Sequence, residues 1–126
     1  ANRTLAVKAG AIEVAVAAMR THASVAELQE RACGVLRNLS SSIVDSRNLA
    51  WNMDAVIAVA AALRGHPTSA GVQETACVAL YFFVKDNNEN KRLARRAGAK
   101  ALATAALKAH HATEKVVTEA QDLLQQ

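Results

Sequence analysis

The hydrophobic and polar positions of the chain recur with a period of 44 residues, three times in succession. One apolar column of this repeat is formed by Leu36, Leu80 and Leu124. A polar column in the same register is formed by His22, His66 and His110. A period of this length is typical of helical solenoids, whose units bury their apolar faces only against their neighbours. The pattern predicts one domain of three repeats, over about 2–45, 46–89 and 90–126.

Within each repeat, the spacing of the apolar residues predicts three helices. In the first repeat we expect a short helix over 2–8 that ends at Ala9-Gly10, a second over 11–21 and a third over 25–41. The other two repeats follow the same plan, with helices expected over 47–53, 54–64, 69–85, 90–97, 99–109 and 113–126.

Several polar residues and helix breakers mark the expected helix boundaries. Ser24 and Glu27 have the spacing of a capping box ahead of the third helix of the first repeat. Asp54 is placed to cap the middle helix of the second repeat, which Gly65, Pro67 and Thr68 then end. The run Asn87, Asn88 and Asn90 marks the loop before the third repeat.

The two ends of the array differ in polarity. The last helix is apolar along one side only, which is typical of the terminal unit of a solenoid because its outer face must meet water. In the first repeat, Ile12, Val14 and Val16 leave little polar surface, so we expect a further repeat to cover this face or a second chain to associate there. The chain begins at Ala rather than Met, and we therefore expect it to be a piece of a longer array.

The composition supports an all-α fold. Hydrophobic residues make up 52% of the chain, yet only four residues are aromatic, and small Ala side chains suit close helix packing better than a sheet. The longest nearly uncharged apolar run, 55–63, is far shorter than the roughly 20 residues that a membrane span needs. We therefore expect no membrane span.

The two cysteines, Cys33 and Cys77, stand in one column of the repeat. Equivalent helices of stacked repeats lie about 8 to 10 Å apart, whereas a disulfide needs Cα atoms within about 7 Å. Buried, reduced thiols are therefore expected. Reduced thiols indicate an intracellular, cytoplasmic location, with which a nuclear one is compatible.

Three sequence strings resemble armadillo repeats. They are the turn Ala9-Gly10-Ala11-Ile12, found again as Ala97-Gly98-Ala99, and the third-helix strings LQERACGVLRNLS (28–40) and VQETACVALYFFV (72–84). HEAT repeats, the nearest alternative, lack the glycine turn between a short first and a longer second helix. The resemblance implies a right-handed solenoid of three-helix repeats that binds proteins, commonly as an extended peptide along a concave groove lined by the third helices.

The importin-alpha branch of that family uses a Trp and, four residues later, an Asn in each groove repeat. In this chain the corresponding Asn column is Asn38, Phe82 and Gln126, and the Trp column is Gly34, Val78 and Asp122. One Asn and no Trp is present, which argues against binding of nuclear-localisation signals. A different protein segment is expected in the groove.

The candidate binding residues follow from the helical spacing of the third helices. We expect the ridge Glu30, Gly34 and Asn38 to neighbour the ridge Glu74, Val78 and Phe82, with Arg37 and Tyr81 beside them. Phe82 supports two interpretations. It either forms a docking pocket with Val78, or it packs between repeats with Tyr81 and Phe83.

A basic run, formed by Lys91, Arg92, Arg95 and Arg96, is the sharpest charge feature of a chain whose net charge is +4. It could be a solvated helix face, or it could meet an acidic protein, nucleic acid or an anionic membrane surface. The lack of interleaved aromatic residues or a known module argues against nucleic acid.

No pattern in the chain predicts catalysis, a metal or a cofactor. The His column cannot converge on one ion, because stacked equivalents lie about 10 Å apart and zinc needs each nitrogen near 2 Å. Phosphate-binding loops and nucleophile motifs are missing from the sequence. We therefore expect a non-enzymatic scaffold or adaptor. The alternatives are a basic adaptor for nucleic acid or membrane, and a segment that only caps a larger solenoid.

Overall fold

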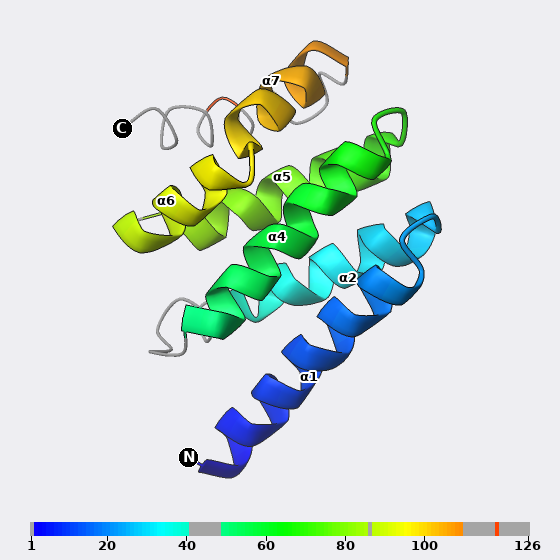
Figure 1. The fold of residues 1–126 in the computed structure, drawn as a ribbon. Coiled ribbons are helices and arrows are strands. Elements are labelled where there is room, and N and C mark those ends of the chain that lie inside the picture. The colour runs from blue at the N-terminus through cyan, green and yellow to red at the C-terminus, as the bar shows by residue number, and fades with distance from the viewer. Residues whose placement is uncertain (1, 41–48, 86, 110–117, 119–126) are drawn as a thin grey trace.

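The structure, a computed structural model, describes residues 2–40, 49–85, 87–109 and 118 (Figure 1). The described part of the chain forms the helices α1 (Asn2–Thr21), α2 (Ala26–Asn38), α4 (Leu49–Gly65), α5 (Ala70–Val84), α6 (Asn88–Arg96) and α7 (Ala99–Ala109). The predicted all-α class is confirmed. None of the helices found in these residues is long and apolar enough to cross a membrane.

The helices are arranged as stacked hairpins. α1 packs on α2 and α4 packs on α5, and the two hairpins then stack so that α1 lies beside α4 and α2 beside α5 (Figure 1). α6 and α7 pack against α4 and α5 on the side away from α1 (Figure 1). One hydrophobic core runs through the stack, from Ile12 and Leu36 through Leu80 and Phe83 to Ala106.

Two of the predicted helix breaks are wrong. α1 continues through Gly10, so a single helix replaces the expected short and middle helices of the first repeat. In the second repeat α4 likewise continues from Leu49 through Met53 and Asp54. The cost of a glycine within a helix is only about 1 kcal/mol, which is small beside the packing of α1 against α2 and α4. Asp54 does not cap a helix and instead forms an ion pair with Arg20 of α1.

The predicted break in the third repeat is confirmed. α6 ends at Arg96, α7 begins at Ala99, and Gly98 between them has φ +81°. Only glycine adopts this left-handed conformation without strain, because a Cβ would crowd the following carbonyl. The same Ala-Gly-Ala string therefore forms a turn at 97–99 and a continuous helix at 9–11.

The remaining boundary signals had mixed outcomes. The capping box at Ser24 is wrong, because Val25 is the N-cap of α2 without a side-chain bond and Glu27 pairs with Arg31. The break after Gly65 is confirmed. Ser69 caps α5, while Asn87 caps α6 and thereby places Asn88 and Asn90 in the first turn of that helix rather than in a loop.

A buried glutamine, which was not expected from the sequence, joins the two helices of each of the first two hairpins. The Nε2 of Gln29 donates to the carbonyls of Met19 and His22, and the Nε2 of Gln73 donates to those of Leu63 and His66. Gln29 and Gln73 stand 44 residues apart, and so do the residues whose carbonyls they bind. The recurrence of glutamine after 44 residues, at Gln29 and Gln73, was the signal that could have revealed this clamp. The clamp satisfies carbonyls at the C-terminal ends of α1 and α4.

Polar side chains also join successive repeats. Arg20 reaches Asp54 at 3.3 Å, and Arg64, its column partner, donates to the carbonyl of Ala97 at 2.9 Å. His66 contacts the carbonyl of Ala23 at 2.7 Å. Residues that stand 44 positions apart in the sequence, such as Arg20 and Arg64, therefore contact the next repeat in the stack. Apart from Thr118, the expected third helix of the last repeat, over 113–126, lies outside the residues that the structure describes, and so does its polar outer face.

Candidate partner-binding surfaces

The predicted ridge between α2 and α5 is present, and in its first half Glu30 and Gly34 approach α5 at Gly71 and Thr75. The carboxylate of Glu30 lies over Gly71 rather than beside Glu74, so closely that a Cβ added to Gly71 would come within 1.6 Å of Oε1. A Cβ added to Gly34 would lie 4.0 Å from Cγ2 of Thr75. The neighbours of Glu30 and Gly34 on α5 are thus three residues earlier than expected.

At the other end of the ridge, two cations and two aromatic rings form a row. Cζ of Arg37 lies 5.3 Å from the ring centre of Phe82, and Nζ of Lys85 lies 5.7 Å from that of Tyr81. The two rings meet edge to face with centres 5.2 Å apart. We call Arg37, Phe82, Tyr81 and Lys85 the cation–aromatic row. Lys85 was missed from the sequence, although it follows Tyr81 by four residues on one helical face.

The burial of the three consecutive aromatic residues decides between the two interpretations of Phe82. Phe83 is fully buried, whereas Phe82 retains 38% of its exposure and Tyr81 is half-buried. The interpretation that Phe82 belongs to the core is therefore wrong. Val78 is half-buried, Asn38 at the end of α2 is exposed, and Arg37, not Asn38, contacts the Phe82 ring.

The ridge changes charge along its length. Glu30 and Glu74 stand in the first half of α2 and α5, whereas Arg37 and Lys85 stand at or just beyond their C-terminal ends. Cations near helix C-termini also interact favourably with the helix dipole. A segment lying along this ridge meets carboxylates first and cations with aromatic rings afterwards.

The basic patch lies on and around α6. Lys91, Arg92 and Arg95 line a hollow of about 290 Å³ together with Asn88, while Arg96 is exposed and does not line it. Arg92 forms an ion pair with Glu89 at 2.5 Å. An exposed pair of this kind contributes little to stability, but it neutralises part of the charge of the patch.

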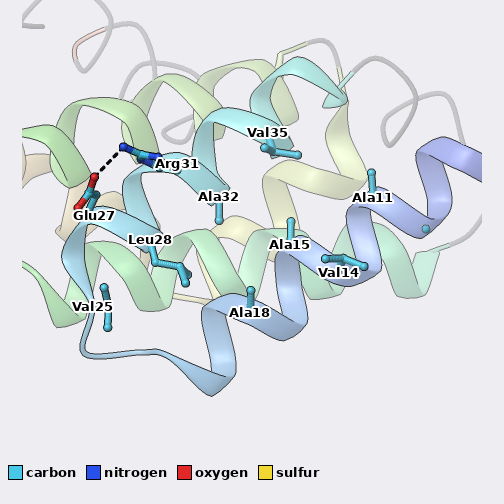
Figure 2. Close-up of a pocket in the computed structure, with 11 residues that line it drawn as sticks. Ala11, Val14, Ala15, Ala18, Val25, Glu27, Leu28, Arg31, Ala32 and Val35 are labelled. Atoms are coloured by element: carbon cyan, nitrogen blue, oxygen red, sulfur yellow. Dashed lines mark hydrogen bonds and ion pairs between the residues drawn. The ribbon is translucent and has the colours of Figure 1, made fainter.

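A larger hollow lies between α1 and α2, on the side away from α4 and α5 (Figure 2). Its volume is about 720 Å³, and apolar side chains of both helices line most of it. Val14 is 70% exposed here, whereas Ile12 and Val16, which we expected on the same uncovered face, are buried at 2% and 5%. Of these three residues, only Val14 therefore lies on the uncovered face, since Ile12 and Val16 belong to the core.

The thiols and imidazoles do not form a chemical site in the described residues. Cys33 and Cys77 are free and buried, and burial, with a smaller effect of Cys77 on Cys33, raises the pKa of both thiols to about 12. A thiol with such a pKa is a poor nucleophile. In the part of the chain that the structure covers, no three His, Cys, Asp or Glu residues are grouped to hold a metal ion.

Comparisons with known proteins do not assign the chain to a family. No family model, no curated protein and no solved structure matches the chain. The resemblance to armadillo repeats therefore rests on the sequence strings and on the turn at Gly98, while α1 has no such turn at Gly10.

Proposed function

We propose that this protein is a scaffold or adaptor that binds a segment of a partner protein along the α2–α5 ridge. The observation that carries the proposal is the exposed cation–aromatic row. Phe82 stays uncovered on a helix whose next residue, Phe83, is fully buried. Aromatic and arginine side chains are enriched among the residues that dominate binding energy in protein interfaces.

The row is suited to binding because its groups are already positioned. A cation over an exposed ring contributes about 0.5–1 kcal/mol, and about 2 kcal/mol or more once a partner excludes water from it. The contact of Arg37 with Phe82 therefore strengthens when the ridge is covered. Asn38, exposed beside the row, has both donors and acceptors for a partner's backbone amide.

The charges of the ridge indicate the chemistry of the segment that it binds. A basic side chain fits over Glu30 and Glu74, and an apolar or aromatic side chain followed by an acidic one fits over Phe82 and Arg37. Such complementarity fixes the direction of the segment more than it raises the affinity. An extended peptide and a helix both satisfy this pattern.

We also propose that the hairpins are armadillo-type repeats of a right-handed solenoid inside the cell. The glutamine clamps, which recur 44 residues apart with the same bonds, and the glycine turn at Gly98 support the repeat. The continuous helices α1 and α4 depart from the armadillo pattern and resemble HEAT repeats in this respect. The buried, free thiols support a reducing compartment.

The proposal is tested by affinity capture from cell extract followed by binding measurements on the captured proteins. We expect Phe82→Ala and Arg37→Glu to lose partners that the unchanged chain retains. Ile57→Ala is the matched control, because Ile57 is a similarly exposed apolar residue on α4, away from the ridge. Circular dichroism checks that each variant is folded. Retention of every partner by both ridge variants would contradict the proposal.

A second candidate function is that of a basic adaptor that binds nucleic acid or an anionic membrane surface. The hollow that Lys91, Arg92 and Arg95 line favours this function. Here we expect binding to weaken steeply with salt, because each neutralised phosphate releases counterions. Arg95→Glu/Arg96→Glu would abolish it, while Phe82→Ala would have no effect. If neither set of variants changes any interaction, the domain only caps a larger array.

A further inference from the structure

The hollow between α1 and α2 has a floor of small residues and a rim of larger ones. Ala11, Ala15, Ala18 and Ala32 are small enough to leave space between the two helices (Figure 2). The rim carries three valines that are strongly exposed for their type, namely Val14 at 70%, Val25 at 45% and Val35 at 42%. An alanine floor with an aliphatic rim fits the ridge of side chains that another helix presents.

The next hairpin of the stack has the same face, and there it is covered. Most residues that line the hollow are apolar and have apolar counterparts 44 positions later in α4 and α5. These counterparts are all buried, with exposures of 0% for Ala55, 5% for Ala58, 0% for Val59, 2% for Ala62, 0% for Val72, 0% for Ala76 and 0% for Ala79. The empty face of α1–α2 therefore corresponds, residue by residue, to an occupied face of α4–α5.

The occupant of the covered face is the preceding hairpin. Arg20 of α1 pairs with Asp54, whose column partner in the hollow is Gly10. On α2, Glu30 lies over Gly71, and a Cβ added to Gly34 would lie 4.0 Å from Cγ2 of Thr75. The column partners of Gly71 and Thr75 are Glu27 and Arg31, which border the hollow and pair with each other at 2.7 Å (Figure 2).

We infer that the hollow docks one more helical hairpin, which precedes α1 in the stack as α1–α2 precedes α4–α5. The hairpin presents large aliphatic side chains in the places of Ile12, Val16 and Met19, which are buried in the existing stack. It inserts them over the alanine floor. The interface between the two observed hairpins continues in this way on the outer side of the first.

The two charged residues of the rim restrict the sequence of that hairpin. In the existing interface Glu30 needs the space that Gly71 leaves open. In the hollow this place is taken by Glu27, so a second glutamate opposite it would meet both a side chain and a like charge. The docked hairpin therefore carries a small or basic residue at the position of Glu30. An unaltered copy of α1–α2 therefore fits the hollow poorly.

The test extends the chain by one hairpin. One fusion places a copy of residues 2–45 ahead of Asn2, with Glu30→Ala in the added copy, and a second fusion carries the unaltered copy. We expect the first fusion to unfold at a clearly higher temperature than the natural chain, and the second at a lower temperature than the first. Equal or lower stability of the first fusion would overturn the inference.

Val14→Glu shows whether the added hairpin occupies the hollow. In the natural chain Val14 is 70% exposed, so the substitution should leave the melting temperature nearly unchanged. In the original copy within the first fusion it should abolish the gain in melting temperature. A gain that survives Val14→Glu would show that the hairpin docks elsewhere and overturns the inference. Light scattering adds a further check, because a natural chain that dimerises and is dissociated by Val14→Glu would identify a second copy as the occupant and contradict the proposal.

Discussion

The thiols of Cys33 and Cys77 show how burial changes the chemistry of a single residue. Both were expected to be buried and reduced, and both are free and buried in the structure. Removal from water disfavours the thiolate, which raises the pKa of each group from 9.0 to about 12. At alkaline pH the protein therefore binds more protons at these residues when it is folded than when it is unfolded.

This difference predicts that the free energy of unfolding falls as the pH rises from 9 towards 12. Below pH 9 the thiols are protonated in both the folded and the unfolded state, and their contribution to the free energy of unfolding is fully present. Between the two pKa values only the unfolded state ionises, which stabilises it. Urea unfolding at pH 8 and pH 10, followed by circular dichroism, measures the loss.

The control for this prediction is Cys33→Ala/Cys77→Ala, which removes both thiols. Other groups that titrate at high pH remain in this variant, so its free energy of unfolding should fall less between pH 8 and pH 10. The difference between the two proteins is the contribution of the cysteines. An identical pH dependence in the two proteins would show that the thiols are accessible in the folded state.

Single residues also decided the register of the α2–α5 ridge. The repeat pattern predicted the two helices of the ridge, and it placed Arg37, Tyr81 and Phe82 near one another, as they are in the structure. It placed the ridge of Glu30, Gly34 and Asn38 beside the ridge of Glu74, Val78 and Phe82, because equivalent residues of stacked helices lie close together. The sequence pattern did not predict the close approach of Glu30 to Gly71, which requires a residue without a Cβ at that position.

At the scale of helices, one sequence string has two conformations. Ala-Gly-Ala is helical at 9–11 and forms the turn between α6 and α7 at 97–99. Because the three residues are identical, the difference is set by the flanking residues and by the helices against which each string packs. In the third repeat Asn87 caps the start of α6, and Gly98 lies just beyond its end.

The two glycines therefore predict opposite effects of the same substitution. Gly10→Ala should raise the free energy of unfolding by about 0.5–1 kcal/mol, because alanine loses less entropy in a helix. A Cβ at Gly10 would meet no atom within 4 Å. Gly98→Ala should lower it by about 1–2 kcal/mol, because φ is positive there. Urea unfolding of both variants measures the two effects. A loss of stability in Gly10→Ala would indicate that residue 10 forms the turn of the armadillo pattern.

At the scale of the whole molecule, one core extends through the stack of described helices. Buried residues from α1 to α7 belong to a single cluster, in which Phe83 is one of the largest side chains. A defect at Phe83 should therefore be felt in the first hairpin as well as in α5. Its neighbour Phe82 lies outside this cluster.

Phe83→Ala should lower the free energy of unfolding by about 3–5 kcal/mol, the usual cost of removing a buried aromatic side chain. Hydrogen exchange should accelerate in α1 and α2 as well as in α4 and α5. Phe82→Ala should cost about 1 kcal/mol, since it removes an exposed ring and its contact with Arg37. Exchange confined to α5 and α6 in Phe83→Ala would show that the hairpins unfold independently.

The sequence by itself determined the all-α class, the 44-residue register and the proximity of Arg37, Tyr81 and Phe82. These features follow from apolar spacing, which acts along each helix and repeats with the chain. Only the tertiary structure decided where helices continue through glycine, which aromatic residue is buried and which face of the first hairpin is uncovered. Each of these depends on a neighbouring helix, because the packing of α1 against α2 and α4 outweighs the local preference of one glycine, and because exposure is a property of the stack.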